Sequence, residues 1–392
     1  MLDTNCVLFD DLVWEDLLPL TYTRPAPEIR IGILTIKEKW QHYFSRVSYK
    51  TKDYLQEKFP LIIENDNLFI NAGIIPTSSI VNAISQLESN QFLIHDEYLI
   101  AFRSDSYSPE SILSDGVQED FTGELLAINN TWDIFELNEK ALKIDFEQIT
   151  KGRKSAPLSS TNNIVAQENI FIEPGAKVEF ATINASEGPV YIGKDSEIME
   201  GVLIRGPLAL CKHSTIKMGA KIYGATTIGP HCKVAGEVQN SVLTGYSNKG
   251  HDGYLGNSVL GEWCNIGADS NNSNLKNNYD KVKLWSYKTG RFEKTGLQFL
   301  GLIMGDHSKC GINTMFNTGT VVGVSANIYG SGFPRNFVPS FSWGGAAGFT
   351  TYSIKKALET AKIVMARRGI ELSEADIKIV EHLFRITEKY RK

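Results

Sequence analysis

The sequence predicts a chain of two unlike parts, an α/β N-terminal domain and a parallel β-helix, with helices at the C-terminal end. The decisive observation is an unbroken period of six, because an aliphatic residue occupies every sixth position from Ile192 to Val234. A helix needs apolar residues at a spacing of 3.6 and an ordinary strand at 2.0, so neither produces this pattern. Mixed helix and strand patterns before residue 152 and helical spacing after residue 351 complete the prediction.

A period of six is typical of a hexapeptide repeat, in which every hexad supplies one short strand and a turn. The row consists of Ile192, Ile198, Ile204, Leu210, Ile216, Ile222, Ile228 and Val234. Three hexads close one triangular coil, so every aliphatic residue of the row points into the same narrow interior. An ordinary β-sandwich with coincidental spacing is the alternative, which an uninterrupted row disfavours.

The chain is expected to divide at changes of pattern and composition. The polar, proline-containing segment before Ile164 is typical of a linker. We expect an α/β domain over 1–152, a linker over 153–163, the β-helix over 164–345 and C-terminal helices over 346–392.

Local patterns add four expectations. In the N-terminal part, we expect a helix over 33–44 and a strand over 59–63. In the β-helix, the period of six fails over 245–256 and over 270–296, where polar residues and glycines gather. We expect both segments to leave the coil as loops, which is where repeat proteins usually carry function.

Composition excludes several classes of protein. The chain has 392 residues with 40 basic and 45 acidic side chains and a net charge of -5, so nucleic acid is not an expected partner. The five cysteines form no CxxC pair, and no metal ligand set is recognisable, so any metal site stays unknown. Without a leader pattern or a long apolar run, we expect a cytoplasmic protein with no membrane partner.

One residue of the first predicted loop suggests chemistry. His251 follows Gly250 and precedes Asp252 and Gly253, and neighbours of these types are not typical of a buried core histidine. A neutral imidazole can accept a proton near pH 7, which suits a general base. A surface histidine in a flexible loop is the alternative.

Five short motifs support the first interpretation by their order. They are Asn240-Ser241-Val242, Lys249-Gly250-His251, Tyr254-Leu255-Gly256, Asn265-Ile266-Gly267-Ala268 and Asn274-Leu275-Lys276. Together they resemble the acetyltransferase domain of the bifunctional N-acetylglucosamine-1-phosphate uridyltransferase/glucosamine-1-phosphate N-acetyltransferase family. The resemblance implies a left-handed parallel β-helix, a homotrimer with active sites shared between subunits, and acetyl-CoA as co-substrate.

The resemblance also implies residue roles. His251 matches the base that takes a proton from the 2-amino group of glucosamine 1-phosphate, while Tyr254 and Asn265 match residues that position sugar and base. Substrate contacts are implied for Lys249, Asn274 and Lys276, and an acetyl-CoA contact for Ala268. The family's cations for the sugar phosphate have no clear counterpart here; the candidates are Arg205, Lys221, Lys217 and Lys233.

The segment Leu18 to Pro25 (LPLTYTRP) is similar to the start of sugar-phosphate nucleotidyltransferases. The resemblance implies uridyl transfer with UTP and Mg²⁺ if this domain is active, and it makes Arg24, with Thr21 and Thr23, the candidate nucleotide contact. The glycine-rich phosphate loop is missing, because residues 10–15 (DDLVWE) replace it. A turn kept for packing is the alternative for Arg24.

The sequence therefore predicts a transferase that acetylates an amino-sugar 1-phosphate, with uridyl transfer giving UDP-N-acetylglucosamine as a possible second step. Two alternatives stay open. The chain could be a nucleotidyltransferase alone, with the β-helix serving to form a trimer, or a non-catalytic scaffold that binds a sugar nucleotide.

Overall fold

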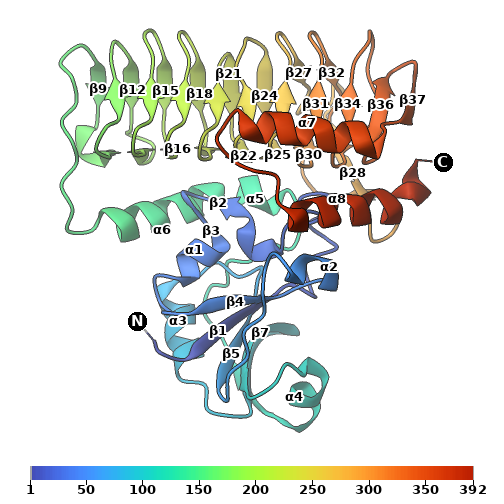
Figure 1. The fold of residues 1–392 in the computed structure, drawn as a ribbon. Helices are drawn as coiled ribbons and strands as arrows, with labels where there is room; N and C mark the ends of the chain where they lie inside the picture. The colour runs from blue at the N-terminus through green and yellow to red at the C-terminus, as the bar shows by residue number, and fades with distance from the viewer. Residues whose placement is uncertain (1, 392) are drawn as a thin grey trace.

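The structure is a computed structural model that describes residues 2–391. An α/β domain packs against the side of a long parallel β-solenoid, and two C-terminal helices lie beside both (Figure 1). The predicted fold class is confirmed.

The N-terminal domain is built on a six-stranded sheet of order β4-β1-β5-β7-β6-β8, in which β1 pairs in parallel with β4 and β5. Its elements are β1 (Asn5–Phe9), η1 (Ala26–Glu28), β2 (Arg30–Ile31), β3 (Leu34–Thr35), α1 (Ile36–Trp40), β4 (Val47–Lys50), α2 (Asp53–Gln56), β5 (Asn67–Asn71), α3 (Ser78–Ser85), β6 (Gln91–His95), β7 (Tyr98–Ser104), α4 (Pro109–Asp115), β8 (Val117–Asp120), α5 (Asp133–Glu136) and α6 (Asn138–Thr150).

Two local predictions in this domain were wrong in extent or type. The helix expected over 33–44 is only α1, because Thr35 caps it by accepting a hydrogen bond from the Glu38 N–H in a capping box. Residues 59–63 form no strand. Pro60 has no N–H to donate to a sheet, which weakens pairing at this position.

The solenoid has three faces of stacked strands, which pair in parallel except at β37, the last strand, which is antiparallel to β36. The nine-stranded face comprises β10 (Ile170–Ile172), β13 (Val190–Ile192), β16 (Leu208–Leu210), β19 (Thr226–Ile228), β22 (Val242–Gly245), β25 (Val259–Glu262), β30 (Leu302–Met304), β33 (Thr320–Val322) and β35 (Phe337–Val338). The six-stranded face comprises β9 (Asn163–Val165), β12 (Thr182–Asn184), β15 (Leu203–Arg205), β18 (Lys221–Tyr223), β21 (Glu237–Gln239) and β24 (Tyr254–Gly256). Next to β24, the stack continues with β27 (Asn271–Asn272), which pairs with β32 (Met315–Phe316).

The ten-stranded face comprises β11 (Lys177–Val178), β14 (Glu197–Ile198), β17 (Thr215–Ile216), β20 (Lys233–Val234), β23 (Asn248–Lys249), β26 (Asn265–Ile266), β31 (Lys309–Cys310), β34 (Asn327–Ile328), β36 (Ser342–Gly345) and β37 (Gly348–Thr351). The predicted row of aliphatic residues fills the interior, because Ile198 pairs with Ile216 and Ile216 with Val234, all fully buried.

The prediction that residues 245–256 leave the coil was wrong. The solenoid continues through β22, β23 and β24, and Lys249 takes the place of an aliphatic residue in the interior row, where it pairs with Val234. The period failed in the sequence for two reasons. A lysine stands at a core position, and the coils here are shorter than 18 residues, since Ile228 pairs with Leu243 and Leu243 with Leu260, which are 15 and 17 residues apart.

The second predicted excursion is partly correct. Residues 271–272 remain in the solenoid as β27, after which the chain leaves it as a hairpin of β28 (Lys283–Ser286) and β29 (Arg291–Lys294). It returns at β30.

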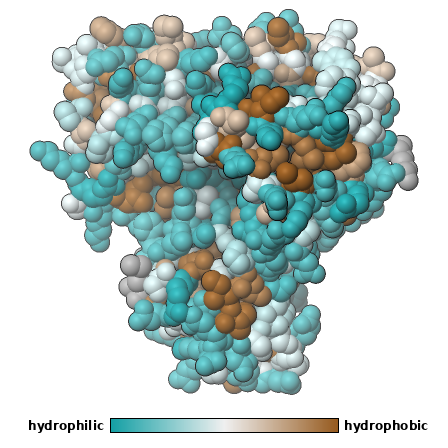
Figure 2. Space-filling view, in the orientation of Figure 1, coloured by the Kyte–Doolittle hydropathy of each residue, from teal (hydrophilic) through white to brown (hydrophobic). Residues whose placement is uncertain are grey.

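The C-terminal helices are α7 (Ile354–Ala366) and α8 (Glu374–Ile386), followed by η3 (Glu388–Tyr390). Helix α7 lies along the solenoid, while α8 lies between the solenoid and the N-terminal domain (Figure 1). Ser373 and Asp376 form a capping box at the start of α8. Figure 2 shows a mostly hydrophilic surface on this side, with hydrophobic residues gathered around the C-terminal helices.

The N-terminal domain covers the nine-stranded face. Outward-pointing Val242, Val259, Ile303 and Val321 of that face are buried in the same hydrophobic cluster as the core of the N-terminal domain. A separate cluster fills the interior of the solenoid. Within residues 2–391, no helix is long and apolar enough to cross a membrane.

Candidate active site

A buried lysine shapes the corner between β23 and β24. The Lys249 side chain is 1% exposed, and its Nζ donates hydrogen bonds to the carbonyl oxygens of His251 at 2.6 Å and Asp252 at 3.1 Å. Burial lowers the pKa of Lys249 to about 8, against the opposing effect of the Asp252 carboxylate. The ammonium thus holds the backbone of residues 251–252 from the interior of the solenoid. The His251 side chain is exposed on the outside.

The backbone of this corner leaves no room for a larger residue at position 253. Gly253 has φ +110°, and a Cβ atom there would lie 2.2 Å from the carbonyl oxygen of Ser270 in the next coil. Glycine tolerates both the conformation and the close approach. The position of His251 is therefore fixed from two sides, by the lysine below and by the glycine that follows.

His251 lines a cavity of about 580 Å³ between the ten-stranded face and α7. Asn265 lies in the same cavity, so two of the three predicted catalytic residues come together. The remaining polar lining includes five cations and no carboxylate among the described residues: Lys217, Lys233, Lys309, Arg367 and Arg368. Such a cavity attracts anionic ligands.

A row of stacked rings runs along one corner of the solenoid, and two of its members reach the cavity. His213, His231, Tyr246, Trp263 and His307 occupy equivalent left-handed positions in successive coils. The ring centroids of Tyr246 and Trp263 are 4.3 Å apart with their planes 14° from parallel, and both rings line the cavity. These flat rings supply a rigid apolar wall beside the cations.

Tyr254 and Asn274 form a hydrogen bond with each other, and neither lines the His251 cavity. The Tyr254 hydroxyl donates to Oε1 of Gln239 at 2.7 Å and accepts from Nδ2 of Asn274 at 2.9 Å, and this Nδ2 also donates to Oδ1 of Asn257 at 2.8 Å. Burial raises the pKa of Tyr254. The cluster lies on the six-stranded face, one strand beyond the corner that carries His251.

Other predicted contacts lie apart from His251 within the chain. Arg205 is exposed on β15, three strands from β24 or about 14 Å at ordinary strand spacing, and pairs with Glu187 at 2.9 Å. Lys221 is exposed on β18. Nζ of Lys276 donates to the Lys281 carbonyl at 3.1 Å, and the Ala268 carbonyl accepts from the Asn313 N–H at 2.9 Å. None of these four residues lines the His251 cavity.

Two sequence-based assignments therefore need correction. Lys249 was expected to contact substrate, but its ammonium is enclosed and occupied by loop carbonyls. Of the candidate cations for a phosphate, Lys217 and Lys233 reach the cavity, whereas Arg205 and Lys221 do not.

Sequence reasoning missed the contribution of α7. Arg367 and Arg368 follow its last turn, and Nη2 of Arg368 donates to Oδ1 of Asn248 at 3.3 Å. The signal present in the sequence was the adjacent arginine pair before Gly369, which is compatible with an ordinary helix end.

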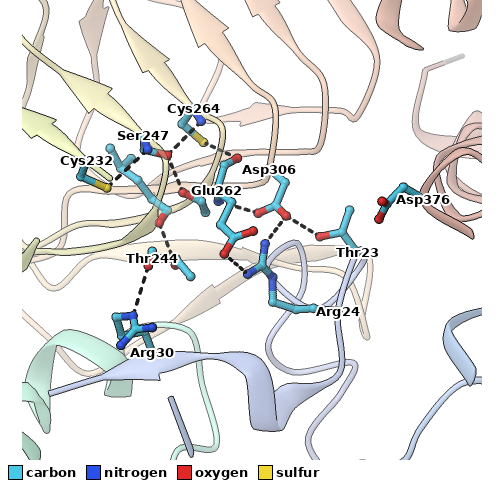
Figure 3. A network of polar contacts seen from close by, with 12 residues as sticks. Thr23, Arg24, Arg30, Cys232, Thr244, Ser247, Glu262, Cys264, Asp306 and Asp376 are labelled. Atoms are coloured by element: carbon cyan, nitrogen blue, oxygen red, sulfur yellow. Dashed lines mark hydrogen bonds and ion pairs between the residues drawn. The ribbon is translucent and has the colours of Figure 1, made fainter. Parts of the chain in front are cut away.

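In the N-terminal domain, two of the predicted nucleotide contacts, Arg24 and Thr23, bind residues of the solenoid, and the third, Thr21, binds within its own domain. The Arg24 guanidinium is buried, lies 3.2 Å from Oε1 of Glu262 and pairs with Asp306, both from the solenoid (Figure 3). The Thr23 hydroxyl donates to Oδ2 of the same Asp306 at 2.6 Å, and that of Thr21 donates to the Trp14 carbonyl at 2.6 Å. Because their polar atoms face protein partners, Arg24, Thr21 and Thr23 are not free to hold a phosphate.

A carboxylate occupies the position at which a doubly wound sheet usually meets its ligand. Asp10 directly follows β1, is fully buried, and accepts hydrogen bonds from the Ala26 N–H at 3.0 Å and the Thr51 hydroxyl at 2.9 Å. Burial raises the pKa of Asp10 to about 6. Both hydrogen bonds reach Oδ2, while Oδ1 of Asp10 is buried without a hydrogen-bond partner among the described residues. A carboxylate therefore stands at this end of β1.

Comparison with known proteins supports both halves of the prediction. Residues 6–154 match the family model described as sugar nucleotidyl transferase. A bifunctional sugar-1-phosphate nucleotidylyltransferase/acetyltransferase of Sulfurisphaera tokodaii is 29% identical over 290 residues, which cover 69% of this chain and 63% of the relative. The predicted resemblance is confirmed.

A second relative gives the same result. The bifunctional protein GlmU of Methanocaldococcus jannaschii is 29% identical over 255 residues, covering 63% of this chain and 55% of the relative. The chain thus spans less than two thirds of the length of both relatives. Within the described residues, no cluster of three or more His, Cys, Asp or Glu side chains is arranged to hold a metal ion.

Proposed function

We propose that this protein is a transferase that moves the acetyl group of acetyl-CoA to the amino group of an amino-sugar 1-phosphate, with glucosamine 1-phosphate as the acceptor. The observation that carries the proposal is the cavity in which an exposed imidazole faces a set of cations with no carboxylate beside them. Both substrates are anions with a neutral reacting centre, which matches this distribution of charge. The printed names of the two relatives point to the same chemistry.

In this proposal, His251 is the general base. Its imidazole takes the proton released as the sugar nitrogen attacks the thioester carbonyl, and CoA leaves as the thiol. Asn265 lies in the same cavity and orients the base or the sugar, while Lys217, Lys233 and the arginines after α7 hold phosphates. Lys249 is a positioning residue, since it acts on His251 through the loop carbonyls.

We further propose a homotrimer whose subunits meet at the corner that carries His251. The N-terminal domain covers the nine-stranded face and α7 lies along the ten-stranded face, so the six-stranded face is the one left for a neighbour. This arrangement would bring Tyr254 and Asn274 of one subunit toward the His251 cavity of another, which accounts for their separation within one chain.

The test is replacement of His251 by alanine in the full chain. We expect the release of free CoA thiol with glucosamine 1-phosphate as acceptor to fall by about 10² or more, the usual contribution of a general base. The matched control is His213→Ala, because His213 is an exposed histidine of the same solenoid that does not line the cavity. Equal rates for the two variants would refute the assignment.

A second candidate function is uridyl transfer by the N-terminal domain, which the family match over residues 6–154 favours. It would require UTP and Mg²⁺ and would give UDP-N-acetylglucosamine from the acetylated sugar phosphate. The ion pair of Arg24 with Asp306 and the buried carboxylate of Asp10 argue for a nucleotide geometry unlike a glycine-rich loop. The measurement is pyrophosphate release from UTP, Mg²⁺ and N-acetylglucosamine 1-phosphate; no release above background would restrict the protein to acetyl transfer.

A further inference from the structure

A larger cavity lies at the C-terminal end of the solenoid, outside both proposed sites. It has a volume of about 1040 Å³ and lies between the hairpin β28–β29, the chain before β35 and the hairpin β36–β37. Its wall includes Lys283, Phe292, Arg335, Asn336 and Phe349. It shares no lining residue with the His251 cavity in the described part of the chain.

The charged side chains that line this cavity are all positive. Lys283 on β28 and Arg335 before β35 are exposed, and neither forms an ion pair within residues 2–391. No aspartate or glutamate lines the cavity. Arg391 and Lys276 also line it, but the Arg391 guanidinium donates to the carbonyls of Phe384 at 2.6 Å and Ser340 at 3.3 Å, and Nζ of Lys276 donates to the Lys281 carbonyl at 3.1 Å. Lys283 and Arg335 are therefore the cations of the wall most available to a ligand.

Aromatic side chains form the other part of the wall. Trp285 stacks on Phe337 with ring centroids 4.1 Å apart and planes 11° from parallel, and Phe292 packs edge-on against Trp285 at 5.4 Å. Phe292 remains 42% exposed, which is unusual for a phenylalanine in a rigid cluster. A flat apolar surface beside two free cations fits a ligand that has a planar ring at one end and phosphates at the other.

We propose that this cavity binds a nucleoside phosphate, with the base against Phe292 and the phosphates between Lys283 and Arg335. The site is separate from the proposed acetyl-transfer site and does not depend on His251. Two ligands contain a nucleoside phosphate of this kind, namely a uridine nucleotide and CoA with its adenosine phosphate. The cavity binds one or both of them.

The test is calorimetric titration of the full chain with UTP, CoA and inorganic pyrophosphate. We expect saturable binding of at least one nucleotide, and at least tenfold weaker binding to the double variant K283A/R335A. Lys294→Ala is the matched control, because Lys294 pairs with Lys283 in the hairpin but lies outside the cavity. Comparison of the UTP and CoA titrations identifies the source.

Two further variants separate the possible outcomes. Phe292→Ala is expected to weaken nucleotide binding without changing pyrophosphate binding, and equal binding of pyrophosphate and nucleotides would overturn recognition of the base. Titration of His251→Ala is expected to show the same Lys283-dependent binding, so failure of the acetyl-transfer proposal would leave this one standing. Wild-type affinity of K283A/R335A for both nucleotides would refute the proposal.

Discussion

Replacement of Lys249 by methionine should separate stability from activity. Methionine has similar length and no charge, so it fits the interior row between Val234 and Ile266 and leaves two loop carbonyls without their donor. The pKa of Lys249 falls from 10.5 to about 8 on folding, so below pH 8 its burial costs about 3 kcal/mol. Loss of the hydrogen bonds costs about 1–3 kcal/mol, so at pH 7 the variant should be about as stable as the wild type, or more stable.

The pH dependence follows from the sign of the shift. The folded protein releases the proton of Lys249 at lower pH than the unfolded chain, so the cost of burial is fully present below pH 8 and disappears as pH rises toward 10.5. Relative to the wild type, the variant should therefore lose about 2 kcal/mol between pH 7 and pH 9.5, as obtained from linkage with these two pKa values. The measurement is urea unfolding of both proteins at several pH values.

Acetyl transfer should respond differently. Without the ammonium, the carbonyls of His251 and Asp252 lose a donor, and a small displacement of the proposed base should cost about 10- to 100-fold in rate. Lys221→Met, an exposed lysine of the same solenoid, is the control and should change stability by less than about 0.5 kcal/mol at every pH. A variant that is less stable than the wild type by the same amount at all pH values would refute this reasoning.

Three other predictions follow from the same geometry. Arg24→Met should destabilise the protein by about 3–5 kcal/mol, measured by urea unfolding, because it leaves buried Asp306 without its partner; lost UTP binding at unchanged stability would contradict the junction role. Gly253→Ala should lower both stability and acetyl transfer, whereas Gly219→Ala, at φ +71° with no atom within 4 Å of the new Cβ, should cost only about 1 kcal/mol and leave the rate unchanged. The KM for acetyl-CoA should rise with ionic strength, since salt screens the cations of the His251 cavity; a KM independent of salt would count against phosphate binding there.

The fold could be predicted where one residue type repeats for one physical reason. The row from Ile192 to Val234 follows from stacking in a narrow interior, and its period shows in the sequence without any knowledge of distant contacts. The prediction failed at Lys249, because a lysine in a core position is readable only when the carbonyls that receive its hydrogen bonds are known. The strand expected over 59–63 failed through Pro60, which interrupts an otherwise apolar run.

The residues of the site likewise divide into those that a sequence pattern reveals and those that only distant contacts reveal. His251 and Asn265 could be found from ordered motifs, since both lie on neighbouring coils whose spacing the repeat fixes. The arginines after α7 could not, because more than 100 residues separate them from Asn248, and only packing of the helix on the solenoid brings them there. Arg24 was misassigned because its partners, Glu262 and Asp306, lie more than 230 residues away in the chain.

The shared hydrophobic cluster has a consequence for how the two halves work. Val242, Val259, Ile303 and Val321 would be laid open to water if the first domain swung away, and the ion pairs of Arg24 would break at the same moment. The segment 151–162 is therefore a tether with no hinge function, and a protease nick within it should leave both pieces together through gel filtration. A swing of the first domain would therefore not carry a sugar from one half to the other.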